Sequence, residues 1–275
     1  MGECRPGLRA CSLELMALAI LLGMLTGLSL GLTGAGGGIL AVPALVLGLG
    51  YSMTAATPVA LLAVGAAALV GALDGLYKHI VRYRAALFMA IMGALLTSAG
   101  LRISQALPEK LLITLFALIM LWIASKMLRR PAERIDHLPP CRLNPDTGRL
   151  RWTGAGTATL AGIGAVAGLF SGMLGVGGGF LIVPALKRFS NLSMHSIVAT
   201  SLMLIALISL SASAISLAQG AVIPSSGWVF VAAAIAGMAL GRQLAPRIPQ
   251  ERLQQGFSLL TALVALSMLA RSYLL

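Results

Sequence analysis

The sequence predicts an all-α polytopic membrane protein built from two homologous halves of about four spans each. Of its 275 residues, 58% are hydrophobic and only 10% are charged, whereas soluble domains average ~45–50% apolar and ~25% charged residues. So few charges cannot cover the surface of a water-soluble protein. A second observation, an internal repeat at an offset of 141 residues, predicts the two halves. The composition therefore disfavours soluble enzymes, disordered chains and secreted disulfide scaffolds.

Eight segments are apolar enough to cross the ~30 Å of bilayer hydrocarbon, which requires a helix of ~20 residues, although several of them are short. In chain order they are residues 13–33, 54–73, 85–101, 111–127, 154–174, 196–218, 227–241 and 256–274. The first segment follows Arg5 and Arg9 and so resembles a signal peptide. It lacks an A-x-A cleavage site and has a counterpart later in the chain, so we expect it to belong to the folded protein.

The repeat is clearest where residues 27–45 align with residues 168–186, because twelve of these nineteen positions are identical. Both copies contain Gly-Gly-Gly and Val-Pro-Ala-Leu in the same register. We therefore divide the chain into a first transmembrane repeat at residues 1–128, a linker at 129–153 and a second repeat at 154–275. The linker is rich in proline and arginine, as is typical of a solvated connector.

Each triple glycine is followed by an apolar segment that is too short to span and contains a proline, at residues 39–50 and 180–186. If these segments are re-entrant, the chain has eight crossings. If each completes a crossing as part of a broken helix, the chain has ten segments and the halves are inverted. Both arrangements place the linker in the cytoplasm by the positive-inside rule. The inverted one puts 15 of the 20 Lys and Arg residues on the linker side, so we favour it, with external termini.

Two glycine clusters mark the predicted substrate site. They are Gly36, Gly37 and Gly38 in the first half and Gly177, Gly178 and Gly179 in the second. Glycine frees the backbone from helix, and irregular backbone survives in a bilayer only where protein buries it or where it lines a cavity. Backbone N–H groups near the start of a half-helix bind anions. The alternative is tight helix packing through small residues. A proline five residues after each cluster favours the broken-helix site.

Hydroxyl groups form the second part of the predicted site, at Thr57-Pro58 and Thr200-Ser201. These pairs align if the second half carries two extra residues before Thr200. A hydroxyl donates to an anion without a buried charge, and Pro58 frees a helix carbonyl. The alternative is ordinary hydrogen bonding of each hydroxyl within its own helix.

Ser171 is a further candidate donor, and together with His195 it raises the alternative of an intramembrane serine hydrolase. We disfavour an enzyme, because Leu30 occupies the equivalent position in the first half and Ser193 to Ser196 resemble the start of a helix. Ser171 is then a small residue at a helix crossing or a hydroxyl donor to the substrate.

The charged residues favour an anionic substrate. No acidic residue lies in the middle of a predicted span, which disfavours a cation pump. Asp74 lies at the end of its span, near Lys78 and His79, where we expect it to be solvated.

The three cysteines lack ligand spacing, so we predict no metal site and no cofactor. The net charge of +12 is expected in cytoplasmic loops rather than on a nucleic-acid surface. The expected partners are a small anion, the lipid bilayer and, in a homo-oligomer, further copies of the chain.

At these motifs the sequence resembles the TauE/SafE sulfite exporter family, also called the toluene-sulfonate uptake permease family. The resemblance covers nearly the whole chain and rests on the duplicated Gly-x-x-Gly-x-Gly-Gly-Gly-x-x-x-x-Pro-x-Leu signature and on the Ala199-Thr200-Ser201 element. Thr57-Pro58 departs from the Thr-Ser usual in the first half. The resemblance implies a multi-pass secondary transporter of the bacterial inner membrane that exports sulfite or organosulfonates. A permease for another small anion is the main alternative.

Overall fold

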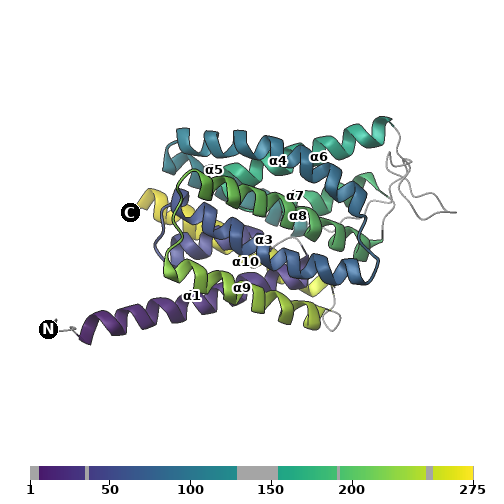
Figure 1. Ribbon diagram of the computed structural model, residues 1–275. Helices are drawn as coiled ribbons and strands as arrows, with labels where there is room; N and C mark the ends of the chain where they lie inside the picture. The colour runs from purple at the N-terminus through teal and green to yellow at the C-terminus, as the bar shows by residue number, and fades with distance from the viewer. Residues whose placement is uncertain (1–5, 35–36, 129–153, 191–192, 246–249, 275) are drawn as a thin grey trace.

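The computed structural model describes residues 6–34, 37–128, 154–190, 193–245 and 250–274, and these residues fold as a bundle of helices (Figure 1). In chain order the elements are α1 (Pro6–Thr33), α2 (Gly37–Pro43), the π-helix η1 (Ala44–Gly48), α3 (Met53–Tyr77), α4 (Tyr83–Ala106), α5 (Glu109–Leu128), α6 (Gly154–Leu174), α7 (Gly179–Phe189), α8 (Met194–Ala218), α9 (Ser225–Leu244) and α10 (Gln250–Leu274). No strand occurs in the described ranges, which confirms the predicted all-α class.

Seven of the helices in the described ranges are long and apolar enough to cross a membrane, namely α1, α3, α4, α6, α8, α9 and α10. Each predicted span lies inside an observed helix. The segment predicted at 111–127 lies inside α5, which has Glu109 and Lys110 in its first turn and Lys126 in its last. The protein is therefore a polytopic helical membrane protein.

The segments after the triple glycines form short helices that contain the predicted prolines. Gly37–Gly48 is one apolar stretch in which α2 contains Pro43 and passes into the π-helix η1. Every residue of α2 is buried. In the second half, α7 is eleven residues long and contains Pro184. Helices of this length cannot cross the hydrocarbon alone, so neither segment spans a membrane by itself.

The two halves interlock through glycine-lined helix contacts. Helix α1 packs along α9 in the same direction, because Gly27 meets the backbone of Ala234 and Gly31 meets that of Met238. Helix α6 packs along α4 in the same way, with Gly168 against the backbone of Gly93. Small residues at these crossings allow the backbones to approach closely. The first helix of each half therefore packs on the fourth helix of the other.

The central pair of helices, α3 and α8, run in opposite directions. A Cβ on Gly75, near the end of α3, would lie 3.0 Å from the Cβ of Ala199, near the start of α8. Helices α5 and α10 are also antiparallel, because Ser258 early in α10 donates to the carbonyl of Ala124 late in α5. Corresponding helices of the two halves thus point in opposite directions.

Two ends of the bundle follow from these directions. We call the end where α1 begins and α10 ends the terminal face, and both lie on the left of Figure 1. We call the opposite end, where α5 ends and α6 begins, the linker face. Arg271 joins the end of α10 to the broken segment at the terminal face by donating to the carbonyls of Val46 and Leu47.

Candidate functional site

The glycine-rich loops begin where α1 and α6 end, and both begin with the same backbone turn. Gly34 has a φ of 71° and Gly175 a φ of 73°, in the left-handed region that glycine adopts without strain. Gly177 and Gly178 share this conformation, with φ values of 72° and 66°. Gly36 lies outside the described residues. The repeated turn allows the backbone of each half to leave its long helix and enter a short one.

The two loops meet in the middle of the bundle. The backbone of Gly38 lies against the carbonyl of Val176, so the first loop contacts the second directly. A Cβ on Gly38 would lie 3.4 Å from Val64 Cγ1, and a Cβ on Gly177 would lie 3.2 Å from the same atom. Val64 is in the middle of α3. The structure therefore brings the two predicted glycine clusters together beside the central helices.

The remaining predicted glycines pack closely against backbone. A Cβ on Gly37 would overlap the backbone of Leu30, and a Cβ on Gly178 would lie 2.6 Å from the carbonyl oxygen of Ala167. Gly179 is buried and is the first residue of α7. Any side chain at Gly37 or Gly178 would displace the loop that contains it.

The predicted hydroxyls lie beside the glycine loops of the opposite half. Thr57 donates to the carbonyl of Met53 at 2.9 Å, and its Cα would lie 3.0 Å from a Cβ on Gly175. Ser201 donates to the carbonyl of Gly34 at 3.3 Å and to that of Val198 at 2.8 Å.

Thr200 forms its hydrogen bond outside the two glycine loops. Its hydroxyl accepts from the backbone N–H of Arg82 at 3.1 Å.

The helix starts correct the predicted alignment of the hydroxyl pairs. Ser52 and Ser193 occupy the N-caps of α3 and α8, and each side chain accepts from the backbone N–H three residues later. The offset of 141 thus holds at both caps and leaves no place for two extra residues. Val198, not Thr200, is the counterpart of Thr57.

Thr57 and Pro58 line a cavity of about 280 Å³ at the terminal face. The cavity lies between the start of α3 and the ends of α4 and α8, and its mouth is formed by the exposed side chains of Gln105 and Gln219. These two amides hydrogen-bond to each other at 3.2 Å. The polar side chains of the lining are uncharged and come from Thr54, Thr57, Ser104, Gln105, Ser216 and Gln219.

Three serines form a buried stripe that runs from this cavity towards the glycine loops. Ser216 lines the cavity, and Ser213 and Ser209 follow one and two helical turns deeper on the same face of α8. Ser213 donates weakly to the carbonyl of Pro58, at 3.5 Å. Ser209 is fully buried and lies beside Gly177. The sequence analysis did not single out these serines, although their i, i+4, i+7 spacing is visible in the sequence.

Ser171 is fully buried, and its Oγ has no hydrogen-bond partner among the described residues. A nucleophilic serine needs a base within hydrogen-bond reach. His195 is at the start of α8, at the linker face, whereas Ser171 is in the last turn of α6, towards the terminal face. This geometry gives the hydrolase alternative no support.

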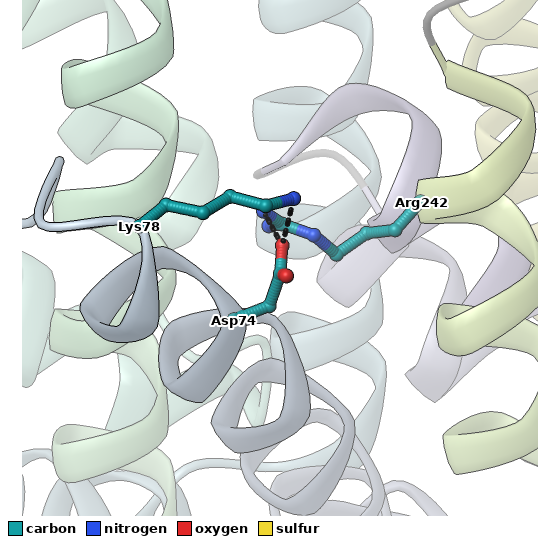
Figure 2. Close-up of polar contacts among 3 residues, drawn as sticks. All are labelled: Asp74, Lys78 and Arg242. Atoms are coloured by element: carbon teal, nitrogen blue, oxygen red, sulfur yellow. Dashed lines mark hydrogen bonds and ion pairs between the residues drawn. The ribbon is translucent and has the colours of Figure 1, made fainter.

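An ionic cluster lies at the linker face (Figure 2). Arg242, in the last turn of α9, donates to Oδ2 of Asp74 at 2.5 Å, and Lys78 donates to the same oxygen at 3.0 Å. Asp74 and Lys78 both belong to the end of α3, so only Arg242 joins two helices. The Asp74 side chain is 36% exposed, which agrees with the predicted position at a solvated helix end.

The offset of 141 relates this cluster to the cavity at the opposite face. Arg242 is the counterpart of Leu101, which lines the cavity. Gly75 is the counterpart of Ser216, which also lines the cavity, but Gly75 packs directly against α8. A cavity therefore lies at the terminal face, whereas the equivalent place on the linker face is filled by the packing of α3 against α8.

No group of three or more His, Cys, Asp or Glu residues that could hold a metal ion occurs in the part of the chain that was described. The chemistry available at the cavity and the loops is that of hydroxyls, amides and backbone groups.

Comparison with known proteins identifies relatives over most of the chain. A family model described as "Sulfite exporter TauE/SafE" matches residues 19–268. A "Probable membrane transporter protein" of Xylella fastidiosa (strain 9a5c) is 30% identical over 254 residues, which cover 91% of this chain and 94% of the relative. "Probable membrane transporter protein YunE" of Bacillus subtilis (strain 168) is 28% identical over 243 residues, 84% of this chain and 87% of the relative. The predicted resemblance is confirmed.

Proposed function

The chain belongs to the TauE/SafE sulfite exporter family of membrane transporters, and we propose that it is a secondary transporter that exports small sulfur-containing anions, such as sulfite or organosulfonates, across the bacterial inner membrane. The relatives' names support a transporter rather than an enzyme.

The observation that supports the proposal best is the meeting of the two glycine loops beside α3 and α8. A helix that starts in the middle of a membrane protein presents unpaired N–H groups and the positive end of its dipole. The uncharged donors of the cavity can bind an oxyanion without a buried cation, and the lining contains no carboxylate to repel it. A cavity of about 280 Å³ lies just below the usual range of ligand pockets, ~300–1,000 Å³, and suits a small substrate.

Alternating access follows from the inverted arrangement of the halves. Transporters with inverted repeats expose a central site first to one side and then to the other by rocking one unit against its partner. The open cavity at the terminal face and the ionic cluster at the linker face support one of these two states. In the other state, α3 and α9 separate at Asp74 and Arg242, and the cavity at the terminal face closes.

The distribution of basic side chains supports a cytoplasmic linker face. Among the described side chains, the Lys and Arg residues at the linker face are Lys78, Arg82, Arg84, Lys126, Lys187, Arg188 and Arg242, and those at the terminal face are Arg102, Lys110 and Arg271. By the positive-inside rule the linker face is then in the cytoplasm, and the cavity described above opens to the outside.

The proposed site is tested by replacing a loop glycine and measuring flux. Gly178→Leu places a side chain against the backbone of Ala167 at a left-handed φ, so we expect sulfite flux in proteoliposomes to fall at least tenfold. The matched control is Gly162→Leu, because a Cβ there meets nothing within 4 Å. Membrane insertion of both variants is compared by yield and by gel filtration in detergent. Equal flux in Gly178→Leu and wild type contradicts the site.

A permease for another small anion is the second candidate, because neutral donors bind any small oxyanion. The same liposomes distinguish the two when phosphate and nitrate are tested beside sulfite and methanesulfonate. Saturable flux of phosphate or nitrate, with none of the sulfur anions, would transfer the proposal to that anion.

A further inference from the structure

Ser209 is a buried polar group whose environment does not satisfy it. Its side chain is 0% exposed, and its Oγ has no hydrogen-bond partner in the described part of the chain. Leaving a buried hydroxyl without a partner destabilises the folded state, so such groups are uncommon in folded proteins. Serines elsewhere on α8, such as Ser211 and Ser216, donate to carbonyls of their own helix. The exception at Ser209 therefore points to a ligand.

The Ser209 hydroxyl faces the loop that leads into α7. A Cβ on Gly177 would lie 2.5 Å from Ser209 Oγ, so the absence of a side chain at Gly177 leaves the hydroxyl directly beside the loop backbone. Gly177 comes two residues before α7, which runs for eleven residues from Gly179. In the first turn of this helix the N–H of Leu181 donates to the carbonyl of Gly178 at 3.1 Å, whereas helix geometry leaves the N–H groups of Gly179 and Phe180 without an acceptor within the helix. The helix dipole places partial positive charge at the same end.

We propose that Ser209 binds the substrate, donating its hydroxyl hydrogen to an oxyanion oxygen held at the start of α7. This inference rests on the proposed function and adds a binding residue to it. The ligand class is a sulfur oxyanion, whose several oxygens can accept from Ser209 and from backbone N–H groups at once. Hydrogen bonds to a charged acceptor are the stronger class, which suits a site without a cation.

The serine stripe gives this site a connection to the cavity. Ser216 lines the cavity, and Ser209 lies seven residues earlier on α8, which corresponds to about 10 Å along a helix. Ser213 lies between them, beside the carbonyl of Pro58. The three hydroxyls therefore lie on successive turns of one face of α8, between the cavity and the glycine loop.

The site belongs to one half only. The counterpart of Ser209 at an offset of 141 is Ala68 on α3, which has no hydroxyl and is also fully buried. The counterparts of Ser213 and Ser216 are Ala72 and Gly75, which are likewise apolar. Each chain therefore has one inner anion site, formed by α8 and the start of α7.

The test compares Ser209→Ala with the matched control Ser211→Ala on the same helix. Wild type, purified in detergent, is titrated with sulfite and separately with methanesulfonate, and the melting temperature is recorded, because a ligand that binds only the native state stabilises it. Loss of a hydrogen bond to a charged group is worth roughly a factor of ten or more. We expect Ser209→Ala to raise the half-saturating concentration at least tenfold, and Ser211→Ala to change it less than twofold.

The ligand-free proteins separate a binding role from a structural one. Because the Ser209 hydroxyl has no protein partner, Ser209→Ala is expected to melt at the same temperature as wild type or higher. Equal half-saturation in Ser209→Ala and wild type would overturn the inference while leaving the proposed function intact. If neither anion stabilises wild type and wild type transports neither anion, both the inference and the proposed function would be overturned. A response to only one of the two anions identifies the free inorganic or the organic sulfur acid as the ligand.

Discussion

At the scale of single residues, the glycine loops depend on both backbone conformation and space. Gly177 adopts a left-handed φ of 72° and lies beside Ser209, Ile205 and Val64. Gly50 has a similar φ of 69°, but a Cβ there would meet nothing within 4 Å. Substituting each of the two glycines therefore distinguishes the free energy of backbone strain from that of a steric clash.

Alanine at these two positions provides a test. A left-handed conformation costs an L-residue about 1–2 kcal/mol, so Gly50→Ala is expected to lower the melting temperature modestly. Gly177→Ala adds a clash with the Ser209 hydroxyl and is expected to lower it further and to abolish stabilisation by sulfite. Thermal melting with and without sulfite measures both effects. Equal melting temperatures and equal sulfite responses in the two variants would show that the packing around Gly177 is unimportant.

The sequence predicted the loop glycines and missed the most informative serine. The glycines stand out because a triple glycine recurs in register, and both backbone conformation and close packing explain such a pattern. Ser209 does not stand out, because α8 contains six serines and three of them bond within the helix. What distinguishes Ser209 from the other serines of α8 is that its buried hydroxyl has no partner among the described residues and lies beside Gly177, and both facts come from the packing of the second glycine loop against α8.

At the scale of elements, the ionic cluster holds α9 against α3 at the linker face. Arg242 is the cation of the cluster that lies on a different helix from Asp74. Lys78 binds the same carboxylate from within the end of α3. Removing Arg242 therefore breaks the ion pair between the two helices, whereas removing Lys78 leaves that ion pair in place.

This difference predicts the behaviour of two variants. In a protein whose native cysteines are replaced by serine, Val198→Cys at the start of α8 reports access from the linker face. We expect Arg242→Ala to increase the labelling rate of this cysteine by a soluble maleimide several-fold, because the closed state loses its ion pair. Lys78→Ala is the control and should change the rate little. A labelling rate that is the same in both variants would contradict a gating role for Arg242.

The helices themselves were largely predictable from hydropathy, and their contacts were not. Every predicted span lies inside an observed helix, and the short segments after the glycines are the short helices α2 and α7. The alignment of Thr57 with Thr200 was wrong, because it paired residues of the same type and did not use the N-caps of the two helices as reference points. Ser52 and Ser193 fix the register of α3 and α8, and Val198 occupies the position that Thr200 was expected to fill.

At the scale of the whole molecule, the two halves exchange their first helices, so that α1 packs on α9 and α6 packs on α4. A single sequence shows that the halves repeat but not which helix of one half meets which helix of the other. In the sequence, the glycines that make these contacts possible look like ordinary small residues of a membrane helix. Only the structure shows which helix each of them contacts. Because this interlocking ties α1 to α9 and α6 to α4, any rigid unit that moves includes helices of both halves.

The most direct test of alternating access is trans-stimulation of sulfite transport. Proteoliposomes are loaded with unlabelled sulfite or with buffer, and the uptake of radiolabelled sulfite at equal external concentration is followed over time. We expect internal sulfite to accelerate uptake and to drive a transient accumulation of label, because a carrier returns faster when loaded. We expect Gly178→Leu to show neither effect. Saturable uptake that ignores internal sulfite, or uptake equal to that of empty liposomes, would contradict alternating access.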